Sequence, residues 1–284
     1  MFIFIFVCIF VYQTNKFKQF RIPPILLNLR EINNDALMRR KQVSSVPNKI
    51  DTIPVTSRRI GSWRICVSRY ALPPGELAER YDLVAKQWQR TATRYQLDTA
   101  YRAPLHASGA PAALLAKAGQ AQVLDCGIGT GSLSLALNQL LQQRVNWHGI
   151  DTSTEMLNEA SSGMHQAGIA PELKQADVQS LPYPSASFDL VMAAHVLEHL
   201  PEPRQGLLEM VRVLKPGGKL FICMTRQSLF GALVKLRWRT WTVSESQTLT
   251  WLRDCLLADV GLSPVKLGPL AGWASTAFWA SRPA

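Results

Sequence analysis

After residue 73, apolar and polar residues follow two rhythms along the chain. Short apolar segments predict strands over residues 122–126, 145–150, 188–193 and 219–224, and a further strand is predicted over residues 173–176. Apolar residues that recur every three or four positions predict helices, which cover residues 76–94, 132–141, 153–167 and 202–214. Strands alternating with helices are typical of an α/β fold with a doubly wound parallel sheet. Ligands bind beyond the carboxyl ends of such strands, so the loops there are the expected site.

The first 70 residues lack this rhythm. They open with a run of 12 apolar or aromatic residues, and Lys16, Lys18 and Arg21 follow it. A bilayer-spanning helix needs about 20 apolar residues, and a secretory signal has its basic residues before the apolar run. A targeting segment, a short anchor and translation from an upstream start all stay open. We therefore expect residues 1–70 to form no folded domain and residues 71–284 to form the functional domain.

Charge is distributed as unevenly as hydropathy. The chain has 31 Lys and Arg against 20 Asp and Glu, a formal charge of +11, but residues 1–70 alone hold 12 against 3. The remaining body is nearly neutral and lacks the basic face that nucleic acid requires, so a nucleic-acid partner is not expected. Five scattered cysteines form no disulfide framework or thiolate zinc pattern. They favour a reducing, cytoplasmic location, with membrane association left open.

A glycine-rich loop follows the strand predicted at 122–126. It reads Asp125-Cys-Gly127-Ile-Gly129-Thr-Gly131, and glycines at this spacing let the backbone turn sharply beside a ligand. The dinucleotide fingerprint would place its third glycine where Ser132 stands. A carboxylate at Asp125 disfavours a pyrophosphate and suits a cofactor that carries an ammonium group, such as S-adenosylmethionine.

Two more acids end the next two predicted strands. Asp151 stands 24 residues after Gly127, where an acid can accept hydrogen bonds from ribose hydroxyls. Asp177 follows the strand at 173–176, where a carboxylate could accept from an adenine amino group. Each acid alone could be a solvated loop residue or a helix cap. Three acids at the ends of three successive strands favour a cofactor site.

The segments VLDCGIGTG, GIDTSTEML, QADVQSLPYPSASFDLV, HVLEHL and RVLKPGG occur in this order. Together they resemble the class I S-adenosylmethionine-dependent methyltransferases, and within them the small-molecule subgroup that includes the ubiquinone and menaquinone biosynthesis methyltransferases. The resemblance is strong over residues 120–224, loose over 75–119 and 225–284, and absent from 1–70. It implies a Rossmann-like, seven-stranded, mostly parallel sheet, completed by a helix at 246–258 and a hairpin of strands near 264–267 and 274–281.

The resemblance also assigns roles to individual residues. Those implied for the methionine part of the cofactor are Asp125, Gly127, Gly129 and Gly131. Those implied for the adenosine part are Asp151 at the ribose, Met156 near the adenine, and Asp177 and Val178 at the adenine edge. Ala194 and His195 are implied to lie beside the reactive methyl group.

His195 opens a string, His195-Val-Leu-Glu198-His199, that also matches a zinc-protease pattern. Two histidines four apart on one helix could share a metal, but no third ligand suggests itself, and similar strings in the family hold none. We therefore predict no metal. His195 is the candidate general base, because its usual pKa of about 6.5 suits proton transfer, although lining the pocket would equally explain it.

The acceptor is predicted to be a small molecule, with lipophilic or aromatic compounds in view. Selectivity is expected in residues 76–102 and 225–250. Within the latter, residues 229–241 mix tryptophans with cations, which is typical of an amphipathic lid helix or of peripheral membrane contact. An accessory protein that binds cofactor without transfer, an RNA methyltransferase and a nicotinamide-dependent dehydrogenase are the alternatives. Oligomeric state is left open.

Overall fold

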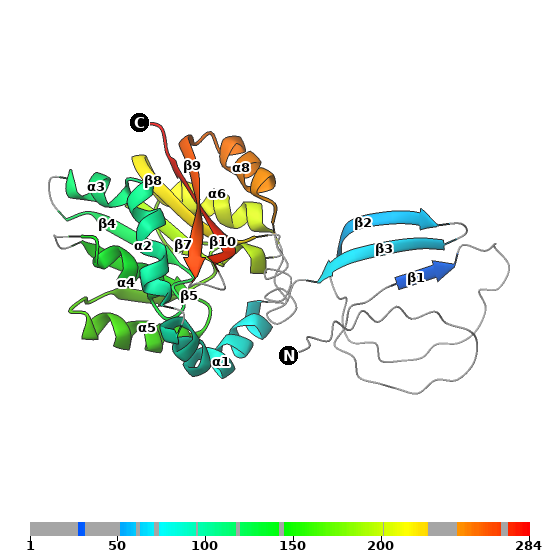
Figure 1. Ribbon diagram of the computed structural model, residues 1–284, viewed down its shortest axis with the longest axis horizontal. Coiled ribbons are helices and arrows are strands. Elements are labelled where there is room, and N and C mark those ends of the chain that lie inside the picture. Colours follow the sequence, from blue (N-terminus) through cyan, green and yellow to red (C-terminus); the bar gives the residue numbers. More distant parts are fainter. Residues whose placement is uncertain are drawn as a thin grey trace. The chain divides into compact units, whose positions relative to one another are not determined.

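The structure is a computed structural model that describes residues 28–31, 52–60, 63–70, 74–94, 96–117, 120–141, 145–200, 202–226, 243–267 and 272–284. The chain divides into two compact units, Met1–Tyr70 and Ala71–Ala284 (Figure 1). In the first unit, strands β1 (Asn28–Glu31), β2 (Thr52–Ile60) and β3 (Trp63–Tyr70) form an antiparallel sheet in the order β1-β3-β2. The sequence pattern did not predict these strands. That residues 1–70 form no domain of their own stays a prediction.

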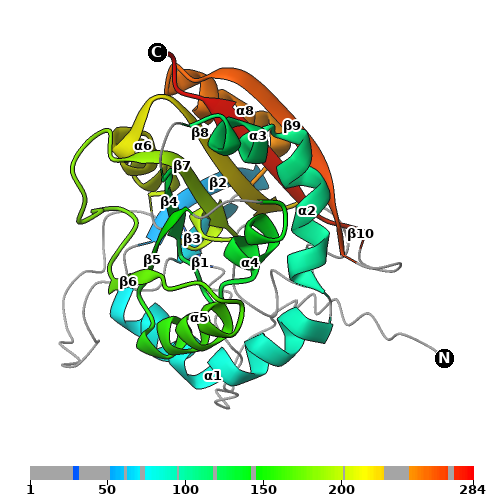
Figure 2. The ribbon, with the colours of Figure 1, turned by 90° about the vertical axis from the view of Figure 1, so that its left-hand side faces the viewer.

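The second unit contains a seven-stranded sheet in the order β6-β5-β4-β7-β8-β10-β9 (Figure 2). The strands are β4 (Gln122–Cys126), β5 (Asn146–Asp151), β6 (Glu172–Gln175), β7 (Phe188–Ala194), β8 (Leu214–Thr225), β9 (Ala258–Leu267) and β10 (Gly272–Ser281). The first five in sheet order are parallel, while β10 runs antiparallel to both β8 and β9. The predicted mostly parallel, Rossmann-like α/β fold with a final antiparallel hairpin is confirmed.

The helices of this unit are α1 (Pro74–Arg94), α2 (Leu97–Ala107), α3 (Ala110–Leu115), α4 (Ser132–Asn138), α5 (Thr154–Gln166), α6 (Pro203–Val213) and α8 (Glu245–Asp254). Of Thr152 and Ser153, either of which could cap this helix by its sequence, Ser153 is the N-cap, because its Oγ accepts a hydrogen bond from the Met156 N–H. Helices α2 and α3 were not predicted as separate elements. The predicted helix at 246–258 is four residues too long at its end, since Ala258 already belongs to β9.

Strand β8 begins at Leu214, directly after α6, and not at residue 219 as predicted, so it includes Lys215-Pro-Gly-Gly218. Leu214 pairs with Phe188, and the register then shifts before Leu190 pairs with Lys219. Gly217, whose φ is 70°, lies within this irregularity. The breaker residues therefore form a bulge inside the strand.

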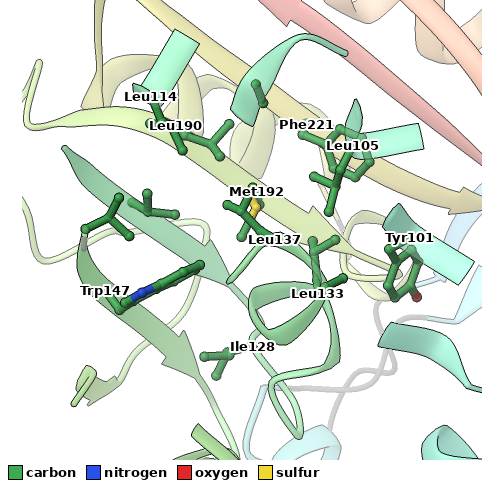
Figure 3. Packing of buried hydrophobic residues seen from close by; sticks show 14 of the residues in the cluster. Tyr101, Leu105, Leu114, Ile128, Leu133, Leu137, Trp147, Leu190, Met192 and Phe221 are labelled. Atoms are coloured by element: carbon green, nitrogen blue, oxygen red, sulfur yellow. The ribbon is translucent and has the colours of Figure 1, made fainter. Parts of the chain in front are cut away.

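Two hydrophobic clusters cover the two faces of the sheet, because successive strand residues point to opposite sides. Leu190 and Met192 of β7 belong to the first cluster, together with Leu105, Leu114, Leu133 and Leu137 from the helices (Figure 3). Val191 and Ala193, the alternate residues of the same strand, belong to the second with Leu207 and Met210 of α6. Each fully buried Leu or Met side chain stabilises the fold by about 1.5–3 kcal/mol. These clusters hold the strand ends in fixed positions.

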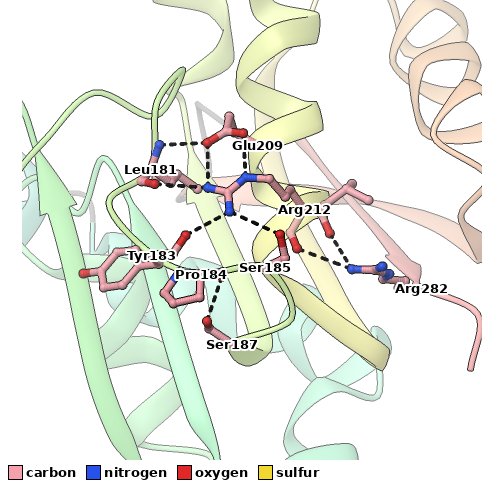
Figure 4. A network of polar contacts seen from close by, with 9 residues as sticks. Leu181, Tyr183, Pro184, Ser185, Ser187, Glu209, Arg212 and Arg282 are labelled. Atoms are coloured by element: carbon pink, nitrogen blue, oxygen red, sulfur yellow. Dashed lines mark hydrogen bonds and ion pairs between the residues drawn. The ribbon is translucent and has the colours of Figure 1, made fainter.

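A polar network fixes the loop between β6 and β7 against α6 (Figure 4). Arg212 donates from Nε to Glu209 Oε1 at 2.7 Å and from Nη1 to the Tyr183 carbonyl at 2.9 Å. Glu209 Oε2 accepts from the Leu181 N–H at 2.9 Å. The guanidinium thereby satisfies carbonyl groups of this loop, whose Ala186 and Ser187 N–H groups also donate to the Arg212 and Val213 carbonyls of α6.

Candidate functional site

The glycine loop leaves β4 at Cys126 and leads directly into α4. Gly127, Gly129 and Gly131 all have left-handed φ values, of 65°, 54° and 83°. A Cβ at Gly127 would lie 2.4 Å from Val196 Cγ2, whereas nothing lies within 4 Å of a Cβ at Gly129. The Ile128 N–H donates to the Ile150 carbonyl at 2.8 Å, which holds the loop against β5. The loop is thus packed against Val196 at Gly127 and faces open space at Gly129.

Asp125 lies beneath this loop with 1% of its surface exposed. Its Oδ2 accepts a hydrogen bond from Ser134 Oγ at 2.7 Å. Burial raises the pKa of Asp125 to about 7, although the Ser134 hydrogen bond opposes the shift. A buried carboxyl group near its pKa at neutral pH is a group that a neighbouring cation can ionise.

Asp151 connects the glycine loop to α5. Its Oδ2 accepts from the Gly129 N–H at 2.9 Å, and its Oδ1 accepts from the Ser153 N–H at 2.9 Å. Burial raises the pKa of Asp151, against the effect of these backbone donors. Each carboxylate oxygen keeps a further lone pair for a ligand. The structure therefore brings together two sites that the sequence predicted separately.

The predicted adenine-side residues follow β5 and β6. The Ala176 N–H donates to the Asp151 carbonyl at 3.0 Å, so the two strand ends are joined. Asp177 accepts from the Gln179 N–H at 2.9 Å, while Val178 is buried. Met156 is buried in the first turn of α5. These three residues therefore follow the ends of β5 and β6, and their contact with the adenine stays a prediction.

His195 follows β7 with a φ of 59°, a left-handed conformation that is uncommon outside glycine. Its Nδ1 lies 3.1 Å from Glu198 Oε1 and 3.2 Å from Thr225 Oγ1, and its Nε2 lies 3.3 Å from Ser275 Oγ. Glu198 also accepts from the Thr225 N–H at 3.1 Å. Although burial raises the pKa of Glu198, the His195, His199 and Thr225 contacts outweigh it and lower the pKa.

The string from His195 to His199, which resembles a zinc-binding pattern, does not form one α-helix. Leu197–His199 form a 3-10 turn, η1, and His199 Nε2 is hydrogen-bonded to Tyr81 Oη at 2.9 Å. Within the residues that the structure describes, no group of three or more His, Cys, Asp and Glu side chains could hold a metal ion.

Helix α1 contributes two residues that the sequence did not assign to the site. Asp82 Oδ1 accepts from Ser153 Oγ at 2.5 Å and from the Glu155 N–H at 3.2 Å. The pKa of Tyr81 is raised by burial and by the nearby charges of Asp151 and Glu198. The sequence pattern indicated only the helix at residues 76–94, to which Tyr81 belongs. Thr225 and Ser275 were missed too, since each lies at least 30 residues from His195.

Residues 124–222 match the family model described as "Methyltransferase domain". The matched segment contains the glycine loop, Asp151, Asp177 and His195. The chain is 37% identical over 120 residues to a demethylmenaquinone methyltransferase of Lactobacillus johnsonii, covering 42% of this chain and 49% of the relative. It is 41% identical over 103 residues to a phosphatidylethanolamine N-methyltransferase of Cereibacter sphaeroides, covering 36% and 49%. The matched segment thus spans about half the length of these relatives.

A solved structure of magnesium protoporphyrin IX methyltransferase from Synechocystis, with bound SAH, superposes with a TM-score of 0.56 at 19% identity. The match covers 74% of this chain and all of the other. A methyltransferase from Thermotoga maritima superposes with a TM-score of 0.52 at 15% identity, covering 71% and 98%. At such identities the likeness establishes the shared fold. The comparisons together confirm the resemblance to class I S-adenosylmethionine-dependent methyltransferases that the sequence predicts.

Proposed function

We propose that the chain transfers the methyl group of S-adenosylmethionine to a small, lipophilic or aromatic molecule. The observation that carries this proposal is the arrangement of Asp125 and Asp151 around the glycine loop. One is buried beneath the loop, and the other accepts a hydrogen bond from Gly129. The open side of Gly129 provides the cradle that a Cβ would occupy. Carboxylates beside a loop of this shape suit a cationic cofactor better than a pyrophosphate.

The residues present fit this cofactor. Those that would hold its methionine part are Asp125, Gly127, Gly129 and Gly131. Those that would hold its adenosine part are Asp151, Met156, Asp177 and Val178, and Ala194 would face the reactive end. The cofactor supplies an electrophilic methyl group on a sulfonium. The chain aligns the acceptor for in-line attack, with reacting atoms about 3–3.5 Å apart, and excludes water.

We assign His195 as the general base for acceptors that must lose a proton. The acceptor atom forms a bond to the methyl carbon, the carbon–sulfur bond breaks, and its electron pair stays on sulfur to give a neutral thioether. The acceptor's proton passes to His195. The ring is held at the end of β7 with 23% of its side chain exposed, so it can meet a ligand.

Lipophilic acceptors are supported by the relatives. One is named for demethylmenaquinone and another for phosphatidylethanolamine. In the part of the chain that the structure describes, no helix is long and apolar enough to cross a membrane. Access to such acceptors is proposed to come from peripheral membrane contact through residues 1–70 or through residues 229–241, which lie outside the described residues.

A thermal-shift screen with S-adenosylmethionine, S-adenosylhomocysteine and NAD tests the cofactor, and labelled-methyl transfer into extracted quinones and phospholipids tests the reaction. We expect both adenosyl compounds to raise the melting temperature of the wild type and to leave Asp151→Ala unchanged. Stabilisation by NAD alone would contradict the proposal. Cofactor binding without label in any extract would favour the accessory role.

A further inference from the structure

Glu198 is the most deeply buried acid at the carboxyl end of β7. It is 1% exposed and follows His195 by three residues. Its Oε2 accepts from the Thr225 N–H at 3.1 Å, and its Oε1 accepts from Thr225 Oγ1 at 2.5 Å. Two donors from β8 therefore fix the carboxylate in one orientation. The remaining contact of Oε1 is with His195 Nδ1 at 3.1 Å.

These contacts determine which ring nitrogen carries the proton. An ionised carboxylate only accepts hydrogen bonds, and Thr225 Oγ1 has committed its single proton to Glu198. Both groups near Nδ1 are therefore acceptors, so Nδ1 must be the protonated nitrogen of a neutral ring. Nε2 is left as the basic nitrogen. Its recorded neighbour, Ser275 Oγ at 3.3 Å, has a hydroxyl that can donate to it.

The backbone gives an independent reason to look for a function here. His195 has a φ of 59°, and its N–H donates to the Cys223 carbonyl at 2.9 Å. Left-handed backbone at a residue other than glycine is strained and persists only where its surroundings hold it. The contact between Glu198 Oε1 and His195 Nδ1 fixes the side chain that this strained backbone carries.

We propose that Glu198, fixed by Thr225, is a positioning residue that holds His195 as the Nδ1–H tautomer and presents Nε2 to the acceptor. This rests on the proposed function in so far as His195 is the base. The groups that face Glu198 from neighbouring elements are Thr225 and Cys223 of β8, Tyr81 of α1, Tyr101 of α2, and His195 and His199 on its own segment.

The test is ¹⁵N NMR of the full-length protein labelled at its histidines, titrated toward alkaline pH until the His195 ring is neutral. His195→Gln identifies the signals of this ring. In the wild type we expect a protonated Nδ1 and a bare Nε2. In Glu198→Gln the amide oxygen must take the Thr225 N–H, so its NH₂ faces Nδ1. The ring should then switch to the Nε2–H tautomer.

Kinetics give the second readout. Glu198→Gln should lower kcat by about 10²-fold or more, the range of general-base catalysis, and leave the KM for S-adenosylmethionine within about twofold. Asp189→Asn is the matched control. Asp189 is a buried acid at the opposite end of β7 that also accepts from a backbone N–H, that of Gln122 at 2.9 Å. Its loss should change neither the His195 spectrum nor kcat.

The outcomes separate this proposal from the proposed function. An Nε2–H tautomer in the wild type, or an unchanged tautomer in Glu198→Gln, would overturn the positioning role, whatever the protein methylates. An unchanged kcat despite a switched tautomer would overturn it as well. A wild type that has the expected tautomer but transfers no methyl group would refute the proposed function and leave the assignment of the ring intact. The wild-type spectrum does not depend on whether Glu198→Gln folds.

Discussion

At the scale of single residues, two glycines of the same loop differ in what surrounds them. Gly127→Ala must adopt a left-handed φ and also place its Cβ 2.4 Å from Val196 Cγ2, whereas Gly129→Ala faces the backbone cost alone. We expect Gly129→Ala to lower the free energy of unfolding by about 1–2 kcal/mol. Gly127→Ala should lose at least about 1 kcal/mol more, because Val196 has to shift. Urea unfolding of both variants measures this, and equal losses would contradict the packing argument.

Asp125 makes both stability and cofactor binding depend on pH. Its folded pKa of about 7 lies above the ordinary value of 3.8, so the folded state binds the proton more tightly than the unfolded chain does. The contribution of Asp125 to the free energy of unfolding is therefore fully present below about pH 4 and is lost as the pH rises through about 7. Asp151, whose pKa is also raised, contributes with the same sign. A cationic cofactor reverses the preference, because it favours the ionised carboxylate.

We therefore expect the affinity for S-adenosylmethionine to increase between about pH 5.5 and 7, as Asp125 ionises more readily beside the ammonium group. Asp125→Asn should bind more weakly and show a flatter profile. Calorimetric titration at several pH values measures both. Wild-type affinity that falls over this interval would show that the carboxyl group does not face the cation.

At the scale of secondary structure elements, α1 is held to the start of α5 by side-chain hydrogen bonds as well as by packing. Asp82 accepts from Ser153 Oγ and from the Glu155 N–H, next to Asp151. Asp82→Ala removes both acceptor contacts and should cost about 1–3 kcal/mol. Amide hydrogen exchange should become faster in α1 and in the first turn of α5. Glu79→Gln, an exposed change on the same helix, is the control. Equal exchange in both variants would mean that Asp82 does not hold α1.

The strands differ in how well the apolar pattern of the sequence predicted them. Strands β4, β5 and β7 were predicted within one or two residues. Strands β4 and β7 are buried almost throughout and so give nearly continuous apolar runs, whereas burial in β5 is interrupted. Strands β2 and β3 were missed, although their sequences are rich in β-branched residues and only Gly61-Ser62 separates them. Their arginines interrupted the apolar pattern that indicated strands elsewhere.

The same contrast holds within the site. Asp125, Asp151 and the glycines could be predicted because each stands at a fixed distance from a strand end. Glu198 was visible only as part of a metal-like string, since its partner Thr225 is 27 residues away and on another strand. Tyr81 is 118 residues from His199. Contacts between residues so far apart leave no periodic signal, so only the folded chain identifies them.

At the scale of the whole molecule, charge is unevenly distributed along the chain. The two hydrophobic clusters among the residues of described burial belong to the second unit, whereas residues 1–70 hold 12 Lys and Arg against 3 Asp and Glu. The fragment 71–284 should therefore fold alone and bind the cofactor as tightly as the full chain.

Basic residues near an anionic membrane surface each contribute about 1 kcal/mol to the attraction between protein and membrane, and salt at 0.1 M screens this attraction within about 10 Å.

We accordingly expect the full chain to sediment with vesicles that contain anionic lipid, and to be released as the salt concentration rises. The fragment 71–284 should stay in the supernatant, because its 19 Lys and Arg are nearly balanced by 17 Asp and Glu. Neutral vesicles measure the contribution of the apolar run at residues 1–12, which salt should not weaken. If the fragment sediments as well as the full chain does, residues 229–241 become the candidate membrane contact, and the charge of the first 70 residues has no role in it.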